Sequence, residues 1–243
     1  MMKEIKEPVI LTNITKQQLA SMMDLTLLRI DATYGDLERF CMEAVQYHMA
    51  AVAVHPVNVL LVADILKDTD VKVCAALGFY LGQYPPEIKE FEARDAIRKG
   101  ADELDMMINV GALKSGKFDI VKAELDGLVR AAEGRVTKAI LETALLTDDE
   151  IVRVCLMAKE EGVNFVKTST GFRKPGAVLS TVALMRRTVG PEMGVKAAGG
   201  IRTAEQSFAF LRAGANRLGV SEGVKILEEV EKDVRKEEEA KEK

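Results

Sequence analysis

The chain has 243 residues, 48% of them hydrophobic and 30% charged, with a formal net charge of −4. This length suits one large α/β domain or two small ones, and no apolar run approaches the roughly 20 residues of a membrane span. The amino terminus, MMKEIKEPVI, lacks the apolar core of a secretion signal. Three widely spaced cysteines and no clustered histidines argue against disulfides and a metal site. We therefore expect a cytoplasmic protein with no membrane or nucleic-acid partner.

Short apolar segments alternate with longer amphipathic ones along the chain. The expected strands, in order, are Met23–Leu27, Ala50–His55, Val71–Leu77, Glu103–Asn109, Thr137–Glu142, Asn164–Ser169, Gly194–Ala198 and Asn216–Val220. Expected helices between them include Asp36–His48, Glu87–Lys99, Asp148–Glu161 and Ala204–Ala213. Glycines that follow several helices, at Gly100, Gly134, Gly162 and Gly214, are typical of helix C-caps.

Eight strand-then-helix units in one uninterrupted chain predict a single α/β domain, residues 1–243, with the (β/α)8 TIM-barrel fold. A doubly wound open sheet is the alternative, but no G-x-G-x-x-G follows the first strand. Thr15–Met22 is expected to form an extra helix before that strand. Residues 228–243 carry eight acidic and five basic side chains, which predicts a solvated helical tail.

Four charged residues interrupt the apolar strands: Asp24, Asp105, Lys167 and Lys196. They fall on the first, fourth, sixth and seventh expected strands, near the end where barrel active sites lie. A buried ion-pair network is the structural alternative, although such pairs often add little stability compared with apolar side chains. Two lysines that face a confined space also repel each other, which lowers the pKa of one or both.

The chemistry of these side chains suggests a role for each. A lysine that is neutral near pH 7 can form an imine with a carbonyl, and Lys167 is the expected nucleophile. Lys196 would lower the pKa of Lys167, Asp105 would exchange protons with the intermediates, and Asp24 would pair with Lys196. Three threonines could offer hydroxyls to substrate oxygens: Thr26, Thr168 and Thr170.

Glycine-bearing segments follow the last two strands, where barrels of this kind usually bind phosphate. The residues expected to bind phosphate there are Gly171, Gly199, Gly200, Arg202, Gly219 and Ser221. Glu222 must point away from such a site or it will oppose an anion. Arg173 and Lys174, in the loop after Gly171, could offset its charge or could be ordinary surface residues.

Several motifs give the chain a resemblance to the deoxyribose-phosphate aldolase family of class I aldolases, from Met23 to about Leu227. They are MDLTLL, AALGFYLGQ, GADELDMMINVGALKSG, FVKTSTGF and VKAAGGIRT. The resemblance implies a (β/α)8 barrel that reversibly cleaves 2-deoxy-D-ribose 5-phosphate to glyceraldehyde 3-phosphate and acetaldehyde. It further implies a catabolic carbon–carbon lyase that needs no metal or organic cofactor, and a homodimer or larger assembly. By motif, the imine-forming lysine is Lys167, the second catalytic lysine Lys196 and the proton-relay aspartate Asp105.

The chain departs from the family pattern around the expected phosphate site. Glu222 follows Ser221 where the family usually has a second serine, Phe172-Arg-Lys-Pro175 replaces a glycine-rich turn, and Ala198 stands where serine is common. An aldolase with a shifted substrate preference is therefore one alternative. Another is a phosphate-binding isomerase or synthase that uses Asp105 without an imine. A third is a sugar-phosphate-binding barrel without activity.

Overall fold

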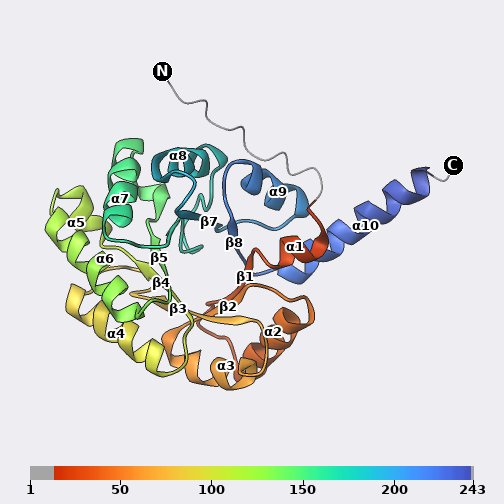
Figure 1. Cartoon of the computed structure of the whole chain (residues 1–243), viewed down its shortest axis with the longest axis horizontal. Coiled ribbons are helices and arrows are strands. Elements are labelled where there is room, and N and C mark those ends of the chain that lie inside the picture. The colour runs from red at the N-terminus through yellow and green to blue at the C-terminus, as the bar shows by residue number, and fades with distance from the viewer. Residues whose placement is uncertain (1–13, 242–243) are drawn as a thin grey trace.

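Eight parallel strands close into a barrel in the order β1 to β8, with β8 paired to β1 (Figure 1). The computed structural model describes residues 14–241 of the backbone and the side chains of residues 14–232. The strands are β1 Met23–Leu27, β2 Ala51–Val54, β3 Lys72–Leu77, β4 Glu103–Met107, β5 Val136–Ile140, β6 Phe165–Lys167, β7 Gly194–Ala198 and β8 Arg217–Val220. The predicted TIM barrel is confirmed, and closure rules out the open doubly wound sheet.

Helices cover the outside of the barrel. They are α1 Lys16–Ala20, α2 Tyr34–Gln46, α3 Val59–Leu66, α4 Pro86–Arg98, α5 Val110–Lys114, α6 Phe118–Ala132, α7 Asp148–Glu160, α8 Leu179–Val189, α9 Ala204–Arg212 and α10 Gly223–Lys241, with short 3-10 helices η1 Pro56–Asn58 and η2 Thr143–Leu145. Capping boxes start three of them: Thr15 with Gln18 begins α1, Thr33 with Asp36 begins α2, and Thr147 with Glu150 begins α7. Each satisfies backbone N–H groups that a helix terminus leaves unpaired.

Four strands, β2, β4, β5 and β6, end one or two residues earlier than predicted, and just past the ends of β6 and β4 polar side chains take part in the hydrogen bonding. At the end of β6, the hydroxyl of Thr168 accepts from the Ala198 N–H and donates to the Ala198 carbonyl, both at 3.1 Å. After β4, the Asn109 side chain caps α5 by accepting from the Ala112 N–H at 2.9 Å. Both strands therefore stop short of loops that carry functional groups.

The first and last helices of the described structure lie against each other at one side of the barrel. The predicted helix before the first strand is α1, which contacts α10 through an ion pair from Lys16 to Glu231 at 2.7 Å. Helix α10 runs beyond the barrel wall (Figure 1) and confirms a helical tail as far as Lys241. Solvation of its side chains after Lys232 lies outside the described residues.

Among the helices within residues 14–241, none combines the length and the apolar character needed to cross a bilayer.

Candidate active site

The four charged residues singled out from the sequence converge inside the barrel. Asp24, Asp105, Lys167 and Lys196 are each at most 2% exposed. Asp105 is central, because its Oδ2 accepts from Lys167 Nζ at 2.7 Å and from Lys196 Nζ at 2.8 Å. The two lysines are direct neighbours across the β6–β7 pair. Lys196 also donates to Asp24.

Sequence reasoning missed three members of this cluster: Glu103, Lys138 and Arg217. Lys138 Nζ lies 2.7 Å from Asp105 Oδ1 and 2.6 Å from Glu103 Oε2. Arg217 donates to Asp24 at 2.7 Å and to Glu103 at 3.1 Å. The same signal, a charge within an apolar strand, marks Lys138 in β5. Glu103 and Arg217 are the first residues of β4 and β8, so neither charge interrupts an apolar run.

The charges inside the barrel balance only when one lysine is neutral. The cluster holds three carboxylates, on Asp24, Glu103 and Asp105, and four basic groups. Unbalanced charge in a buried site is costly. Since Lys138, Lys196 and Arg217 already match the three carboxylates, Lys167 is the basic group that can lose its proton.

The electrostatics point to the same lysine. Burial lowers the pKa of Lys167, the neighbouring Lys196 lowers it further, and Asp105 opposes both without reversing the shift. Burial also acts to lower the pKa of Lys196, but Asp105 and Asp24 outweigh it and raise that pKa. The pKa of Lys167 is therefore shifted down and that of Lys196 up, which are the directions that the predicted roles of the two lysines need.

Asp105 is held as a carboxylate. Burial alone would raise its pKa, but Lys138, Lys167 and Lys196 together keep it well below the ordinary value. The thiol of Cys74 donates to its Oδ1 at 3.1 Å, and burial raises the pKa of Cys74 to about 12. In the free protein Asp105 is thus an ionised carboxylate with no proton to give.

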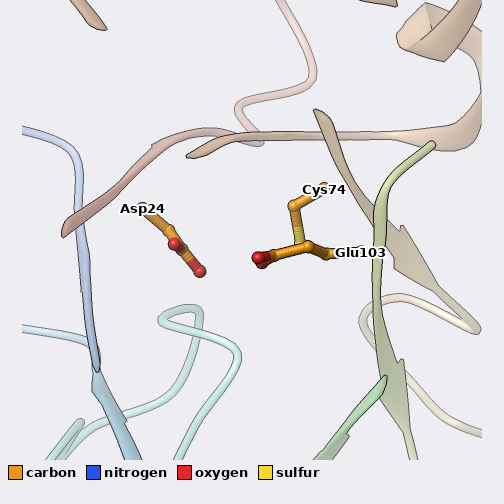
Figure 2. Close-up of side chains that lie close together, drawn as sticks. All are labelled: Asp24, Cys74 and Glu103. Carbon is orange, nitrogen blue, oxygen red and sulfur yellow. The ribbon is translucent and has the colours of Figure 1, made fainter. Parts of the chain in front are cut away.

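Three metal-type donors, on Asp24, Cys74 and Glu103, point toward a common space in the barrel interior (Figure 2). Lys138 Nζ lies 3.4 Å from the Cys74 sulfur and 3.7 Å from an Asp24 oxygen, besides its bond to Glu103. Arg217 donates hydrogen bonds to the other carboxylate oxygens of Asp24 and Glu103. Protein cations already neutralise these donors, so the arrangement does not fit a metal ion.

A cavity of about 370 Å³ opens at the carboxyl ends of the strands, with Lys167 in its wall. Nine of the predicted site residues line it: Thr26, Lys167, Thr170, Gly171, Gly199, Gly200, Arg202, Gly219 and Ser221. Asp24, Asp105, Lys196 and Thr168 are buried and do not line it. A larger cavity, about 490 Å³, lies outside the barrel between α6 and α7 and contains none of the charged cluster.

The glycines of the loops after β6 and β7 allow close backbone contact beside this cavity. The Ala177 N–H donates to the Gly199 carbonyl at 3.0 Å. A Cβ on Gly176 would lie 2.2 Å from the Gly199 oxygen, so only glycine fits there. The cavity wall at these two loops is therefore made largely of backbone, as an anion site requires.

The three threonines are already engaged in hydrogen bonds. Thr26 donates to the Asp24 carbonyl at 3.0 Å, and Thr168 ties β6 to β7. The hydroxyl of Thr170 donates to Glu142, a buried residue that the sequence did not single out. Their hydroxyl protons are thus directed at the protein in this structure.

Charges near the cavity mouth are partly paired. Glu222 lies 3.3 Å from Arg202 and 3.3 Å from Lys225, so its carboxylate is neutralised rather than aimed at an anion. Arg173 and Lys174 are exposed, and within residues 14–232 neither makes a side-chain hydrogen bond or ion pair. They remain available to a ligand at the mouth.

Comparisons with known proteins agree with this geometry. A family model described as DeoC/LacD family aldolase matches residues 16–229. The chain is 52% identical over 214 residues to a deoxyribose-phosphate aldolase of Thermococcus gammatolerans, covering 86% of this chain and 95% of that protein. A deoxyribose-phosphate aldolase of Streptococcus suis is 48% identical over 211 residues, covering 87% and 96%.

Among solved structures, the tetrameric deoxyribose phosphate aldolase of Aeropyrum pernix superposes with a TM-score of 0.83 at 35% identity. That match covers 88% of this chain and 91% of the other. Sequence and fold agree over nearly the whole described chain, and the protein belongs to the DeoC/LacD family of aldolases.

Proposed function

We propose that the protein is a deoxyribose-phosphate aldolase that reversibly cleaves 2-deoxy-D-ribose 5-phosphate to D-glyceraldehyde 3-phosphate and acetaldehyde. The observation that carries this proposal is Lys167, a buried amine of lowered pKa that lines the cavity and contacts Asp105. Two relatives that are 48% and 52% identical to this chain are named deoxyribose-phosphate aldolase, which supports the proposed substrate.

The reaction starts when the neutral amine of Lys167 adds to the aldehyde carbon C1 of the open-chain sugar. The added nitrogen passes one proton to the new alkoxide oxygen, and the resulting hydroxyl takes up a second proton from solvent and leaves as water, which gives an iminium ion whose positive charge replaces the ammonium that Asp105 would otherwise face. Asp105 is the base of suitable reach and charge to take up a proton in these steps, directly or through a water. Lys196 stays charged and keeps the site from reprotonating Lys167.

Carbon–carbon cleavage follows from the iminium. The C3 hydroxyl loses its proton, the C2–C3 bond breaks, and its electron pair moves into the iminium nitrogen to give an enamine. Glyceraldehyde 3-phosphate leaves. The enamine then takes a proton at carbon, and water hydrolyses the resulting iminium to acetaldehyde and the free amine of Lys167. The Asp105–Lys196 pair can supply and recover these protons.

The phosphate end of the substrate would lie against the glycine-bearing segments at the ends of β6, β7 and β8. Backbone N–H groups near Gly171, Gly199 and Gly200 suit an anion, as do those that follow Gly219 at the start of α10. Arg202 could add a positive charge after exchanging its contact with Glu222. Because Arg202 must first leave Glu222, we expect the protein to prefer the phosphorylated over the unphosphorylated sugar less strongly than it would with an unpaired arginine at this position.

Two further expectations belong to this proposal. A homo-oligomer, dimer or tetramer, is supported by the tetrameric relative from Aeropyrum pernix. A cytoplasmic location is supported by three free, buried cysteines, Cys41, Cys74 and Cys155.

The test is reductive trapping of the imine. Incubation with acetaldehyde and sodium borohydride, followed by peptide mass mapping, should place an ethyl adduct on Lys167, and cleavage of 2-deoxyribose 5-phosphate should be lost with it. Lys167→Met should abolish the adduct, while Lys72→Met, at an exposed lysine of β3, should not. An adduct on another lysine, or none, would point instead to a barrel isomerase or synthase without an imine.

A further inference from the structure

Glu142 is a buried carboxylate whose environment is unusual for its charge. It follows β5, is 1% exposed, and has its backbone in the left-handed region at φ 53° and ψ 60°. Within residues 14–232 it makes no ion pair. An unpaired buried carboxylate and a left-handed backbone at a non-glycine residue are both unfavourable. Such costs concentrate at functional sites, where the surrounding structure holds them in place.

The hydrogen bonds of its side chain both come from one residue of the cavity wall, Thr170. Oε2 of Glu142 accepts from the Thr170 N–H at 3.2 Å and from the Thr170 hydroxyl. The same hydroxyl accepts from the Phe172 N–H at 3.3 Å, which closes a tight turn around Gly171. One carboxylate oxygen therefore sets the shape of residues 170–172, and all three line the cavity.

The turn at residues 170–172 packs against the loop after β7. A Cβ placed on Gly199 would lie 3.3 Å from the Cα of Gly171, so the two backbones are already near contact. Ser169, just before the turn, also packs against Gly199. Any shift of residues 170–172 must displace the glycines that face the cavity.

Glu142 does not itself reach the ligand space. It is absent from the cavity wall, and its Oε1 is one of two buried side-chain atoms within residues 14–232 that lack a hydrogen-bond partner, the other being Ser169 Oγ. The residue acts on the cavity only through Thr170.

We propose that Glu142 is the positioning residue of the phosphate site: through Thr170 it holds the Gly171 turn in the conformation that accepts the phosphate group. The inference rests on the proposed function for the identity of the anion. The inference depends on a hydrogen-bond acceptor at position 142 and not on its negative charge, which by itself would repel phosphate.

Binding of inorganic phosphate, measured by calorimetry, tests this without any catalysis. Glu142→Ala should weaken phosphate binding about tenfold, which is the effect expected when the displaced Gly171 turn loses one hydrogen bond to the charged phosphate. Glu142→Gln keeps the acceptor for Thr170 and removes the charge, so it should bind as tightly as the unaltered protein or more tightly. Thr170→Val should weaken binding in the same direction, by a smaller factor. Thermal unfolding verifies that each variant is folded.

Kinetics give a second readout that a general loss of structure would not produce. Glu142→Ala should raise the KM for 2-deoxyribose 5-phosphate about tenfold with little change in kcat, and leave cleavage of unphosphorylated 2-deoxyribose unaltered. Glu150→Ala is the matched control, since it removes a carboxylate that also accepts from a threonine N–H, that of Thr147 at 2.8 Å, but does not line the cavity. That control should shift neither value.

Two results would overturn the inference. One is phosphate binding by Glu142→Ala at full strength, and the other is binding by Glu142→Gln as weak as that of Glu142→Ala. Acetaldehyde trapping at Lys167 is run on the same samples. Failure of trapping in the unaltered protein counts against the proposed function and leaves the phosphate measurement interpretable by itself.

Discussion

The lowered pKa of Lys167 depends on the ions around it as well as on burial. Burial favours a neutral amine, yet the contact with Asp105 at 2.7 Å favours a charged one. What decides between them is that Asp105 is already matched by Lys138 and Lys196. A single lysine beside a single aspartate would remain an ion pair, whereas here the third cation is surplus.

Lys196→Leu is the variant that tests this balance. Without Lys196, the two cations Lys138 and Arg217 leave one of the three buried carboxylates unmatched, and a protonated Lys167 would restore neutrality. The pKa of Lys167 should therefore rise, so that acetaldehyde trapping at Lys167 begins at higher pH, and turnover should be lost. Measuring the trapping rate against pH checks both claims, with Lys72→Leu as the control.

An unchanged pH profile in Lys196→Leu would mean that Lys196 does not set the pKa of Lys167, even if turnover falls.

At the scale of the elements, a second buried ion pair attaches the outer helices to the end of β4. Lys89 of α4 contacts Glu124 of α6 at 2.7 Å, with both side chains fully buried. Lys89 also donates to the Met107 carbonyl at 2.8 Å, and Glu124 accepts from the Asn109 N–H at 2.9 Å. The strand that carries Asp105 is therefore anchored, just past its end, by two helices.

Breaking this pair from one side should be costly. Lys89→Met leaves the Glu124 carboxylate buried without its cation and should lower the free energy of unfolding by about 3–5 kcal/mol. Adding Glu124→Leu should recover much of that loss, because two apolar side chains leave no buried charge. Urea unfolding of the two single variants and the double variant measures the coupling. Additive losses would show that the two side chains act independently.

Element positions follow from local sequence better than element ends do. The alternation of apolar strands and amphipathic helices predicted all eight strands, and glycine signals placed several helix ends. The predicted strand Asn164–Ser169 shortened to Phe165–Lys167 because the Thr168 hydroxyl bonds to Ala198, 30 residues away. A contact of that range leaves no trace in the local pattern.

At the scale of the whole molecule, one network of charges connects strands from around the barrel. Asp24 on β1, Glu103 and Asp105 on β4, Lys138 on β5, Lys196 on β7 and Arg217 on β8 are joined by direct ion pairs. Because these strands come from distant parts of the chain, the network contributes to stability only when the barrel is closed. Its protonation should therefore be linked to global unfolding.

Acid should weaken the fold over a defined pH range. Burial alone would raise the pKa of Asp24, but Lys196, Lys138 and Arg217 outweigh it and lower that pKa to about 2. A carboxyl whose pKa is lowered by folding stabilises the fold above its unfolded pKa, near 3.8, and loses that contribution as pH falls through the folded value. The free energy of unfolding should drop by about 2 kcal/mol from Asp24 alone between pH 4 and pH 2. Asp105 adds to the loss, with its pKa shifted in the same direction.

Denaturant unfolding at pH 2 and at pH 6 measures this loss. Asp24→Asn should be less stable at pH 6 and should show a smaller difference between the two pH values. An equal difference in both proteins would mean that Asp24 does not carry the acid response.

The sequence by itself determined the barrel, its strands and the catalytic candidates, because apolar periodicity and a charge within an apolar strand are local signals. Lys167, Lys196, Asp105 and Asp24 were found in that way, and the structure brings them together. Contacts between distant strands, visible only in the folded chain, added Lys138, Glu103 and Arg217 to this charged cluster and identified Glu142 as the partner of Thr170. Whether a charge is balanced depends on which side chains lie within a few ångströms of it, and closure of the barrel decides that.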